Sequence, residues 1–302
     1  MGDVITRFRA LPDRLDSEEY NYEHFRTAHL VSEIRGAMAT RGVLPGQAAP
    51  DFALPTTEGT TLRLSDLRGK PVLLKFTSFT CPVSSGSVEP MKRLYDRWGN
   101  DVQFCEVLIR QAHPGPGVEA YDSLDRKLDD ARRYVEEEGI PWTVAADDVE
   151  GKTHQVYGGL ANPAYLIDST GRVAFYSLWT NAPNLNTAIA ELLRQDGRGM
   201  ADDGIDRRPR LLPVIAHGWP AIRRGLPQSY IDLETAVPGG ATALWLGWLA
   251  RGWLGESAAR IDETPARPRA HQALSAAVVV AGAVAGAALG LTLYRKLRAV
   301  ED

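Results

Sequence analysis

The stretch "PVLLKFTSFTCPVSSGS", Pro71–Ser87, decides the fold. It begins with a mostly apolar run that predicts a buried strand, and after Pro82 it continues with helical spacing. Proline suits the first turn of a helix, because that turn makes no use of its missing N–H. Cys81, one of two cysteines among the 302 residues, stands between the two elements. The stretch therefore predicts a buried parallel strand, a thiol and a helix in direct succession.

The position of Cys81 favours a reactive thiol. The free N–H groups and the dipole at the start of a helix stabilise a thiolate, so we expect the pKa of Cys81 to be lowered. The alternative is a buried structural cysteine. Cys105 lies inside the apolar run "VQFCEVLI" and is interpreted as a core residue. If the two strands are parallel, Cys105 lies well down the strand beside the one that Cys81 follows.

Residues 44–196 alternate strand and helix patterns and form the predicted domain. "FAL" and "TLRL" around "TTEGT" predict a hairpin. "PVLLKFT", "DVQFCEVLIR", "WTVAA", "AYLID" and "RVAFYS" predict strands, and "SVEPMKRLYDRWG", "SLDRKLDDARRYVEEEG" and "NLNTAIAELLRQ" predict helices. This order predicts an α/β sheet with an antiparallel edge.

Residues 1–43 are predicted to form a helical arm that packs on the domain or on a partner. Phe25, Leu30, Ile34 and Met38 recur at near-helical spacing and form its apolar stripe.

The chain after the domain divides into three predicted parts. Residues 197–272 read as a connector, and its Trp-rich segment 241–255 suits either a helix in the membrane interface or an ordinary packed helix. Residues 273–294 carry no charge over 22 residues and predict a transmembrane helix, with an Ala-rich core helix as the alternative. Residues 295–302 are a short tail.

Composition excludes several classes of protein. The net charge is −4 and no basic block stands out, so we expect no nucleic-acid partner. Two cysteines are too few for a disulfide scaffold. No His or Cys spacing matches a metal site, and we expect neither a metal nor a cofactor.

Several short motifs occur in the order of a known superfamily. "PGQAAPDFAL", "LSDLRGKPVLLKF" and "TCP" resemble the redoxin group of the thioredoxin superfamily, which includes the alkyl hydroperoxide reductase/thiol-specific antioxidant proteins. "SFTCP", "IRQAHPGPG" and "VYGGLANPAYLI" are similar to the iodothyronine deiodinase family and its bacterial relatives. The resemblance covers about residues 44–195. It implies a thioredoxin-like fold, here with an N-terminal helical arm and a C-terminal transmembrane helix.

The candidate catalytic residues are Cys81, His113 and Ser78. The resemblance places Cys81 where the deiodinase family has selenocysteine or cysteine, and His113 where it has histidine. His113 also follows a predicted strand, at the sheet edge where ligands gather, although a solvated loop histidine is the alternative. Ser78 could donate a hydrogen bond to a peroxide or a thiolate. Thr80 and Pro82 flank the thiol and are candidates for substrate binding.

Two further candidates precede the strand "AYLID". The resemblance implies a cis proline at Pro163, facing the cysteine, and Tyr157 is a weaker candidate for substrate binding. The sequence departs from dithiol thioredoxins at Ser84, where they have a second cysteine. It departs from peroxiredoxins at Leu74, where they have proline, and at Ser78, where they have threonine.

Three functions follow as hypotheses. The first is a membrane-tethered thiol oxidoreductase that reduces a peroxide or a disulfide through Cys81 and is resolved by an external thiol. The second is a deiodinase-like reductive dehalogenase. The third is a non-catalytic membrane scaffold with a thioredoxin-like domain.

The sequence also predicts location and assembly. We expect a single-pass membrane protein whose domain faces the cytoplasm, because the N-terminal residues are charged and show no signal peptide. Gly282, Gly286 and Gly290 recur every fourth residue and would let the last helix pair with a second copy or with another membrane protein.

Overall fold

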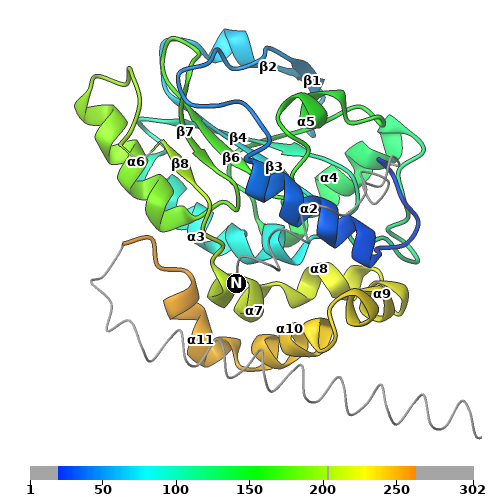
Figure 1. Ribbon diagram of the computed structural model, residues 1–302. Helices are drawn as coiled ribbons and strands as arrows, with labels where there is room; N and C mark the ends of the chain where they lie inside the picture. The colour runs from blue at the N-terminus through cyan, green and yellow to red at the C-terminus, as the bar shows by residue number, and fades with distance from the viewer. Residues whose placement is uncertain (1–19, 203, 263–302) are drawn as a thin grey trace, which may run out of the picture.

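A computed structural model describes residues 20–202 and 204–262, and its centre is a mixed sheet in the order β5-β4-β3-β6-β7-β8 (Figure 1). β3, β4 and β5 are parallel neighbours, while β6 runs antiparallel to β3 and to β7. The strands are β3 (Val72–Thr77), β4 (Gln103–Leu108), β5 (Thr143–Ala146), β6 (Ala164–Ile167), β7 (Val173–Ser177) and β8 (Ile205–Asp206). The parallel centre with an antiparallel edge confirms the predicted α/β class.

Both faces of this sheet are buried. Leu73 belongs to one core cluster, with residues of three helices that cover that face: α3 (Pro82–Trp98), α4 (Leu124–Glu138) and α6 (Ala182–Arg194). Its neighbour Leu74 belongs to the opposite cluster, because successive side chains of a strand point to opposite faces.

The opposite face is covered mainly by shorter segments. The predicted hairpin is present there as β1 (Ala53–Pro55) and β2 (Thr61–Arg63), followed by the short 3₁₀ helix η2 (Leu64–Leu67). The short helix α5 (Lys152–Val156), which the sequence pattern did not predict, precedes β6. Both β3 and β4 therefore lie in the middle of the protein. Because they are parallel, their carboxyl ends lie at the same edge of the sheet.

The arm differs in part from the prediction. Within the described residues its helix is α2 (Thr27–Ala39), and residues 20–26 are not helical. Tyr22 and Phe25 are buried in an irregular segment that lies against the domain, so the packing of these side chains holds the segment in place without a helix. The predicted apolar stripe is wrong at Ile34 and Met38, which are exposed; the buried positions of α2 are His29 and Gly36.

The connector contains more structure than predicted. Within the described residues, five short helices follow the sheet: α7 (Leu211–His217), α8 (Trp219–Arg224), α9 (Gln228–Ala236), α10 (Gly240–Leu249) and α11 (Arg251–Ala258). Gly and Pro, which suggested a linker, stand instead at the ends of these helices, as Gly218, Pro227 and Gly239 do. Figure 1 shows the five helices as a layer along one side of the molecule.

This helical layer packs closely on the domain. A Cβ atom on Gly86 of α3 would lie 2.7 Å from the Cα atom of Val214 in α7. A Cβ atom on Gly115 would lie 2.1 Å from the carbonyl oxygen of Gly225. Only glycine permits such approaches, so the layer and the domain form one packed unit at these points.

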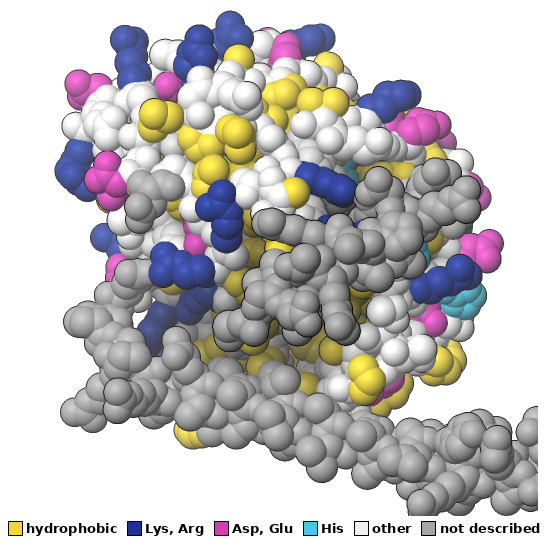
Figure 2. Space-filling view, viewed as in Figure 1, with side chains coloured by type: hydrophobic (Ala, Val, Ile, Leu, Met, Phe, Trp, Pro, Cys, Tyr) yellow, Lys and Arg dark blue, Asp and Glu magenta, His cyan; other side chains and the backbone are white. Residues whose placement is uncertain are grey.

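The surface of the layer carries exposed apolar side chains on α10 and α11. Trp245 is 45% exposed, Leu249 is 60% exposed and Trp253 is 72% exposed. On the face seen in Figure 2, apolar side chains lie among scattered side chains of both charges. No helix within residues 20–202 and 204–262 is long and apolar enough to cross a bilayer. The predicted transmembrane segment 273–294, with its three glycines, lies outside the described residues.

Candidate functional site

Cys81 lies at the junction that the sequence indicates. It is the residue before α3, and its N–H donates to the carbonyl oxygen of Ser78 at 3.2 Å. Its own carbonyl oxygen accepts from the N–H of Ser85 at 3.0 Å, which opens the helix. The side chain is only 3% exposed. The thiol therefore has the predicted backbone position but is enclosed.

The enclosure reverses the predicted pKa shift. Burial raises the pKa of the Cys81 thiol above its usual value, since a thiolate is poorly solvated in the interior. Hydrogen bonds from Ser84 and from the Val83 N–H act in the predicted direction and lower it, while the nearby Glu33 raises it further. The expectation of a lowered pKa for Cys81 is thus wrong. The desolvation of the thiolate raises the pKa by more than the hydrogen bonds at the helix start lower it.

Ser84 is fully buried in the first turn of α3. Its hydroxyl accepts from the Ser78 N–H at 3.2 Å and donates to Oδ1 of Asn162 at 3.3 Å. Ser78 in turn accepts from the Ala112 N–H at 2.9 Å through its hydroxyl oxygen. Both serines therefore tie together the loops around Cys81.

Thr80 brings His113 to the same place. The Thr80 hydroxyl accepts from the His113 N–H at 3.0 Å and donates to Oε1 of Gln111, also at 3.0 Å. The His113 ring packs on Phe25, with ring centroids 4.3 Å apart. Its Nδ1 atom is buried and has no hydrogen-bond partner among the described residues. The structure thus brings Cys81 and His113 to one sheet edge.

His113 is electrically neutral in this setting. Burial lowers its pKa to about 3, with a smaller contribution from His29. A neutral imidazole whose Nδ1 lacks a partner suits a proton transfer to or from a bound molecule.

Three other candidates fall in different places. Pro82 occupies the first turn of α3 and lies beside Gly218 of the helical layer.

Pro163 does not have the implied cis peptide bond. The only cis peptide bond in the described residues joins Leu226 and Pro227, so the Asn162–Pro163 bond is trans and the implied cis form is wrong. Trans is the intrinsically favoured form, and the Pro163 carbonyl oxygen accepts from Phe76 at 2.9 Å in that geometry.

Tyr157 is a core residue. It is fully buried in the cluster on the opposite face of the sheet, and its ring packs on Phe76 with centroids 5.1 Å apart. Its hydroxyl donates to the carbonyl oxygen of Pro50 at 2.7 Å. The structure therefore places Tyr157 away from Cys81.

A cover made by the arm and the helical layer encloses the site, and the sequence analysis missed it. Tyr22 donates to the carbonyl oxygen of Ala112 at 2.9 Å, next to His113. The Phe25 N–H donates to Oδ2 of Asp232 in α9 at 3.1 Å. Tyr22 and Phe25 share a core cluster with residues of the layer, among them Ile222, Leu233, Ala241 and Leu244.

Arg224 fastens the layer to Phe79, two residues before Cys81. Its guanidinium donates to the Phe79 carbonyl oxygen at 2.8 Å and lies 4.1 Å from the Phe79 ring centroid. It also pairs with Glu137 at 2.9 Å and with Glu138 at 2.6 Å. A buried arginine with these partners holds α8 against the loop that leads to Cys81.

A second feature that the sequence analysis missed is a charged pair inside the sheet. Lys75 of β3 and Glu106 of β4 form an ion pair, and both side chains are almost fully buried. Glu106 also accepts from the Tyr134 hydroxyl at 3.0 Å and from the Trp142 indole at 2.9 Å. Single charges within the apolar runs "PVLLKF" and "VQFCEVLI" were the available signal.

Cys105 is remote from this chemistry. It pairs with Leu74 in the ladder between β3 and β4 and belongs to the core cluster that also holds Tyr157. Burial raises its pKa to about 12. Both cysteines are free, and no cluster of metal-ligating side chains occurs in the described part of the chain.

The sheet order and the position of Cys81 before α3 agree with a thioredoxin-like α/β fold. Residues 45–176 match the sequence model of the AhpC/TSA family, which confirms the resemblance for that part of the chain.

Among curated proteins, the chain is 29% identical over 154 residues to the thiol:disulfide interchange protein DsbE of Xylella fastidiosa, covering 50% of this chain and 68% of that protein. It is 27% identical over 108 residues to the thyroxine 5-deiodinase of Ovis aries, covering 33% of this chain and 37% of that protein. A solved thiol-disulfide oxidoreductase from Bacteroides fragilis is 19% identical, with a TM-score of 0.35, over 43% of this chain and 89% of that one. The curated relatives agree with the predicted class of enzyme, a thiol-dependent oxidoreductase.

Replacing His113 with alanine is expected to slow the chemical step at Cys81 by ~10²-fold, the usual contribution of a positioned acid or base. The rate of the parent should show no histidine step between pH 6 and 8, because the pKa of His113 is about 3 in the folded protein. Stopped-flow rates across this range measure both. Equal rates for the parent and the variant would contradict the role.

The lowered pKa of His113 also determines the direction in which the free energy of unfolding changes with pH. The unfolded chain binds a proton at His113 near the ordinary value of 6.5, whereas the folded protein does so only near 3. Between these values the unfolded state holds more protons, so acidification from pH 6.5 towards 3 should reduce the free energy of unfolding. His113→Ala should weaken this dependence in urea titrations at several pH values.

Proposed function

We propose that this chain is a membrane-tethered thiol oxidoreductase that works through one reactive cysteine, Cys81. One observation carries the proposal: Cys81 stands at the junction of β3 and α3, and Ser84 occupies the position of a second thiol. Cys105 packs in the cluster on the opposite face of the sheet and cannot take that part. The names of the relatives, which describe thiol–disulfide chemistry, support the same reaction class.

The reaction needs an external thiol. The Cys81 thiolate attacks a peroxide or a disulfide and becomes a sulfenic acid or a mixed disulfide. No second cysteine in the described domain lies beside it, so a thiol from outside the chain restores Cys81. The cover around the thiol favours a small substrate, or a partner that displaces the arm.

A stopped-flow survey of Cys81 oxidation tests the proposal. The full chain with Cys105→Ala is mixed with hydrogen peroxide, with an organic peroxide and with a small disulfide, and the modified cysteine is identified by mass spectrometry. Rapid, saturable modification of Cys81 by one of these reagents is expected. Reaction no faster than that of a free thiol with all of them would leave the non-catalytic scaffold, which the burial of Cys81 favours.

Reductive dehalogenation is the second candidate. The similarity to the thyroxine 5-deiodinase of Ovis aries and the neutral His113, whose N–H is bonded to Thr80 next to Cys81, favour it. Parallel turnover assays with a peroxide and an iodinated phenol, each with an external thiol, distinguish the two reactions.

The proposed tether is the segment 273–294. Only residues 263–272 separate it from the described chain, a reach of at most ~33–36 Å when fully extended. The exposed Trp253 and Leu249 suit contact with the bilayer interface, which tryptophan favours.

We further propose that the domain faces the cytoplasm. The full chain should remain with membranes after alkaline carbonate extraction. Protease added to intact cells should leave the domain whole, and its digestion from outside would reverse the assignment.

A further inference from the structure

Residues 20–26 form a strap that lies over His113. The strap precedes α2 and is not helical, and within the described residues no backbone–backbone hydrogen bond involves residues 20–25. Its hydrogen bonds to the rest of the protein instead have a side chain as donor or as acceptor. Local opening of such a segment breaks few bonds, so it requires much less free energy than global unfolding.

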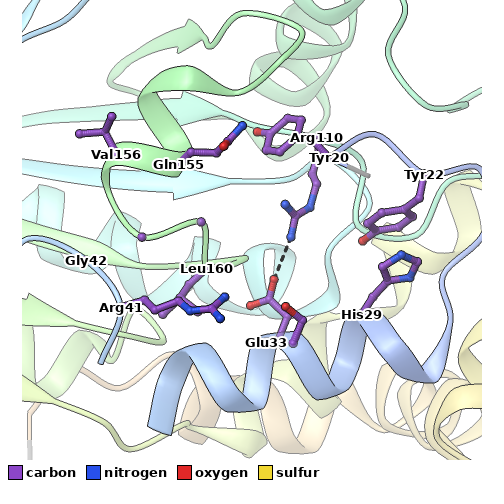
Figure 3. Close-up of a pocket in the computed structure, with 13 residues that line it drawn as sticks. Tyr20, Tyr22, His29, Glu33, Arg41, Gly42, Arg110, Gln155, Val156 and Leu160 are labelled. Atoms are coloured by element: carbon purple, nitrogen blue, oxygen red, sulfur yellow. Dashed lines mark hydrogen bonds and ion pairs between the residues drawn. The ribbon is translucent and has the colours of Figure 1, made fainter. Parts of the chain in front are cut away.

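The strap is anchored to the domain at its beginning and beyond its end. The Tyr20 hydroxyl lies 3.0 Å from Nδ1 of His154. In α2, Glu33 pairs with Arg110 at 3.0 Å. Figure 3 shows this pair as a dashed line, with Arg110 between Glu33 and Tyr20. The part of the strap between these anchors is residues 22–25.

One side of the strap borders open space. Tyr20 and Tyr22 line a pocket of about 500 Å³ between the arm and the domain (Figure 3). Side chains in a close-packed interior cannot shift without displacing their neighbours, whereas side chains at the wall of a pocket have room to do so. The strap therefore has space into which Tyr22 can turn.

One carboxylate fastens the middle of the strap to the helical layer. Oδ2 of Asp232, in α9, accepts from the Phe25 N–H at 3.1 Å and lies 3.3 Å from Nδ1 of His24. Its other oxygen, Oδ1, accepts from the side chain of Gln228. Asp232 is buried, so little water competes for these bonds. A hydrogen bond from an N–H group to a carboxylate belongs to the strong class.

Phe25 is the residue that this bond holds in place. Its ring centroid lies 4.3 Å from that of His113, and its side chain belongs to the core cluster that includes Ile222 and Leu233. His113 is only 6% exposed, and its Nδ1 atom has no partner among the described residues. Movement of Phe25 away from the imidazole would therefore uncover a polar atom that is able to bind a ligand.

The helical layer is the fixed side of this contact. Gly86 and Gly115 approach its backbone so closely that a Cβ atom would not fit. Arg224 bonds to the Phe79 carbonyl oxygen and pairs with two glutamates of α4. Access to His113 therefore depends on the strap, which has no comparable contacts.

We propose that the strap opens and closes over His113 and that Asp232 is its latch. Opening breaks the bond between Phe25 and Asp232 and moves the Phe25 ring off the imidazole, while the helical layer stays on the domain. The inference concerns the regulation of the proposed site and rests on the proposed function for its purpose. The movement itself is measured without any turnover.

Chemical labelling of His113 tests the strap. The full chain is treated with diethyl pyrocarbonate at neutral pH, and mass spectrometry of its peptides follows the rate at each histidine. Asp232→Ala removes the acceptor, and labelling of His113 should become about 10-fold faster, the effect of losing one hydrogen bond to a charged group. Asp232→Asn keeps an acceptor without its charge and should give a smaller increase. The asparagine variant also tests the latch if the alanine variant does not fold.

Glu234→Gln is the matched control on the same helix. The Glu234 carboxylate accepts from the N–H groups of Gly239 at 2.6 Å and of Thr242 at 2.7 Å, within the layer. This variant should leave the labelling of His113 unchanged, because it alters a bond of the same kind that does not reach the strap. His217, in α7, reports on the layer, and its labelling should be the same in every variant.

Two outcomes would overturn the assignment. The first is equal labelling of His113 in the parent and in both Asp232 variants. The second is faster labelling of His217 together with His113, which would show that the layer opens or the protein unfolds. A Cys81 that is inert towards peroxides and disulfides would count against the proposed function alone, because the labelling of His113 requires no reaction at the thiol.

Discussion

Replacing Cys81 with serine is expected to abolish turnover of a peroxide or a disulfide, while Cys105→Ala retains it. A serine hydroxyl in the same position is a far weaker nucleophile and cannot form the sulfenic acid or the mixed disulfide. Cys105 is buried among core residues on the opposite face of the sheet. Steady-state assays with an external thiol measure both variants.

The matched cysteine makes this comparison informative. Both variants remove one of the only two thiols, so non-specific thiol oxidation should fall by a similar amount in each. Loss of activity in Cys105→Ala with retention in Cys81→Ser would reverse the assignment. Circular dichroism and urea unfolding of both proteins confirm that the fold is intact.

Replacing Lys75 with methionine is expected to reduce the free energy of unfolding by about 3–5 kcal/mol, the usual effect of leaving a buried charge without its partner. Glu106 would keep its bonds from Tyr134 and Trp142 but would lose its cation. Urea unfolding monitored by tryptophan fluorescence measures the loss.

The double variant Lys75→Met, Glu106→Gln is the control. With both charges removed, neutral partners fill the same volume, and most of the lost stability should return. A single variant within about 1 kcal/mol of the parent would show that the ion pair contributes little to stability. Lys92→Met on the surface of α3 should have little effect, because its pair with Glu89 is exposed.

The sheet and the position of the thiol could be predicted because their signals are local. The apolar runs around Leu73 and Val107 specify two parallel strands, and Pro82 marks the start of α3. Parallel strands share a carboxyl edge, so Cys81 and His113 had to meet near it. These inferences need only the spacing of apolar residues along the chain and the usual handedness of strand–helix–strand connections.

The enclosure of the site could not be predicted in this way. It depends on contacts between distant parts of the chain, such as Phe25 with Asp232 and Arg224 with Phe79. The pKa of Cys81 follows from that enclosure, and the helix terminus alone indicated the opposite direction. Similarly, the exposed Met38 fits a helical stripe by spacing, but the domain takes up a different face of α2.

The position of the covering helices late in the chain has a consequence for synthesis. The sheet and α6 are nearly complete at Arg194, whereas α11 ends at Ala258. At ~5–20 residues per second, a ribosome needs about 3–13 s to add the 64 residues between them (258 − 194). During this interval the nascent domain has its cysteine in place without α7–α11 over it. For those seconds the arm is the only part of the cover that has been made, and the finished polypeptide then encloses the thiol.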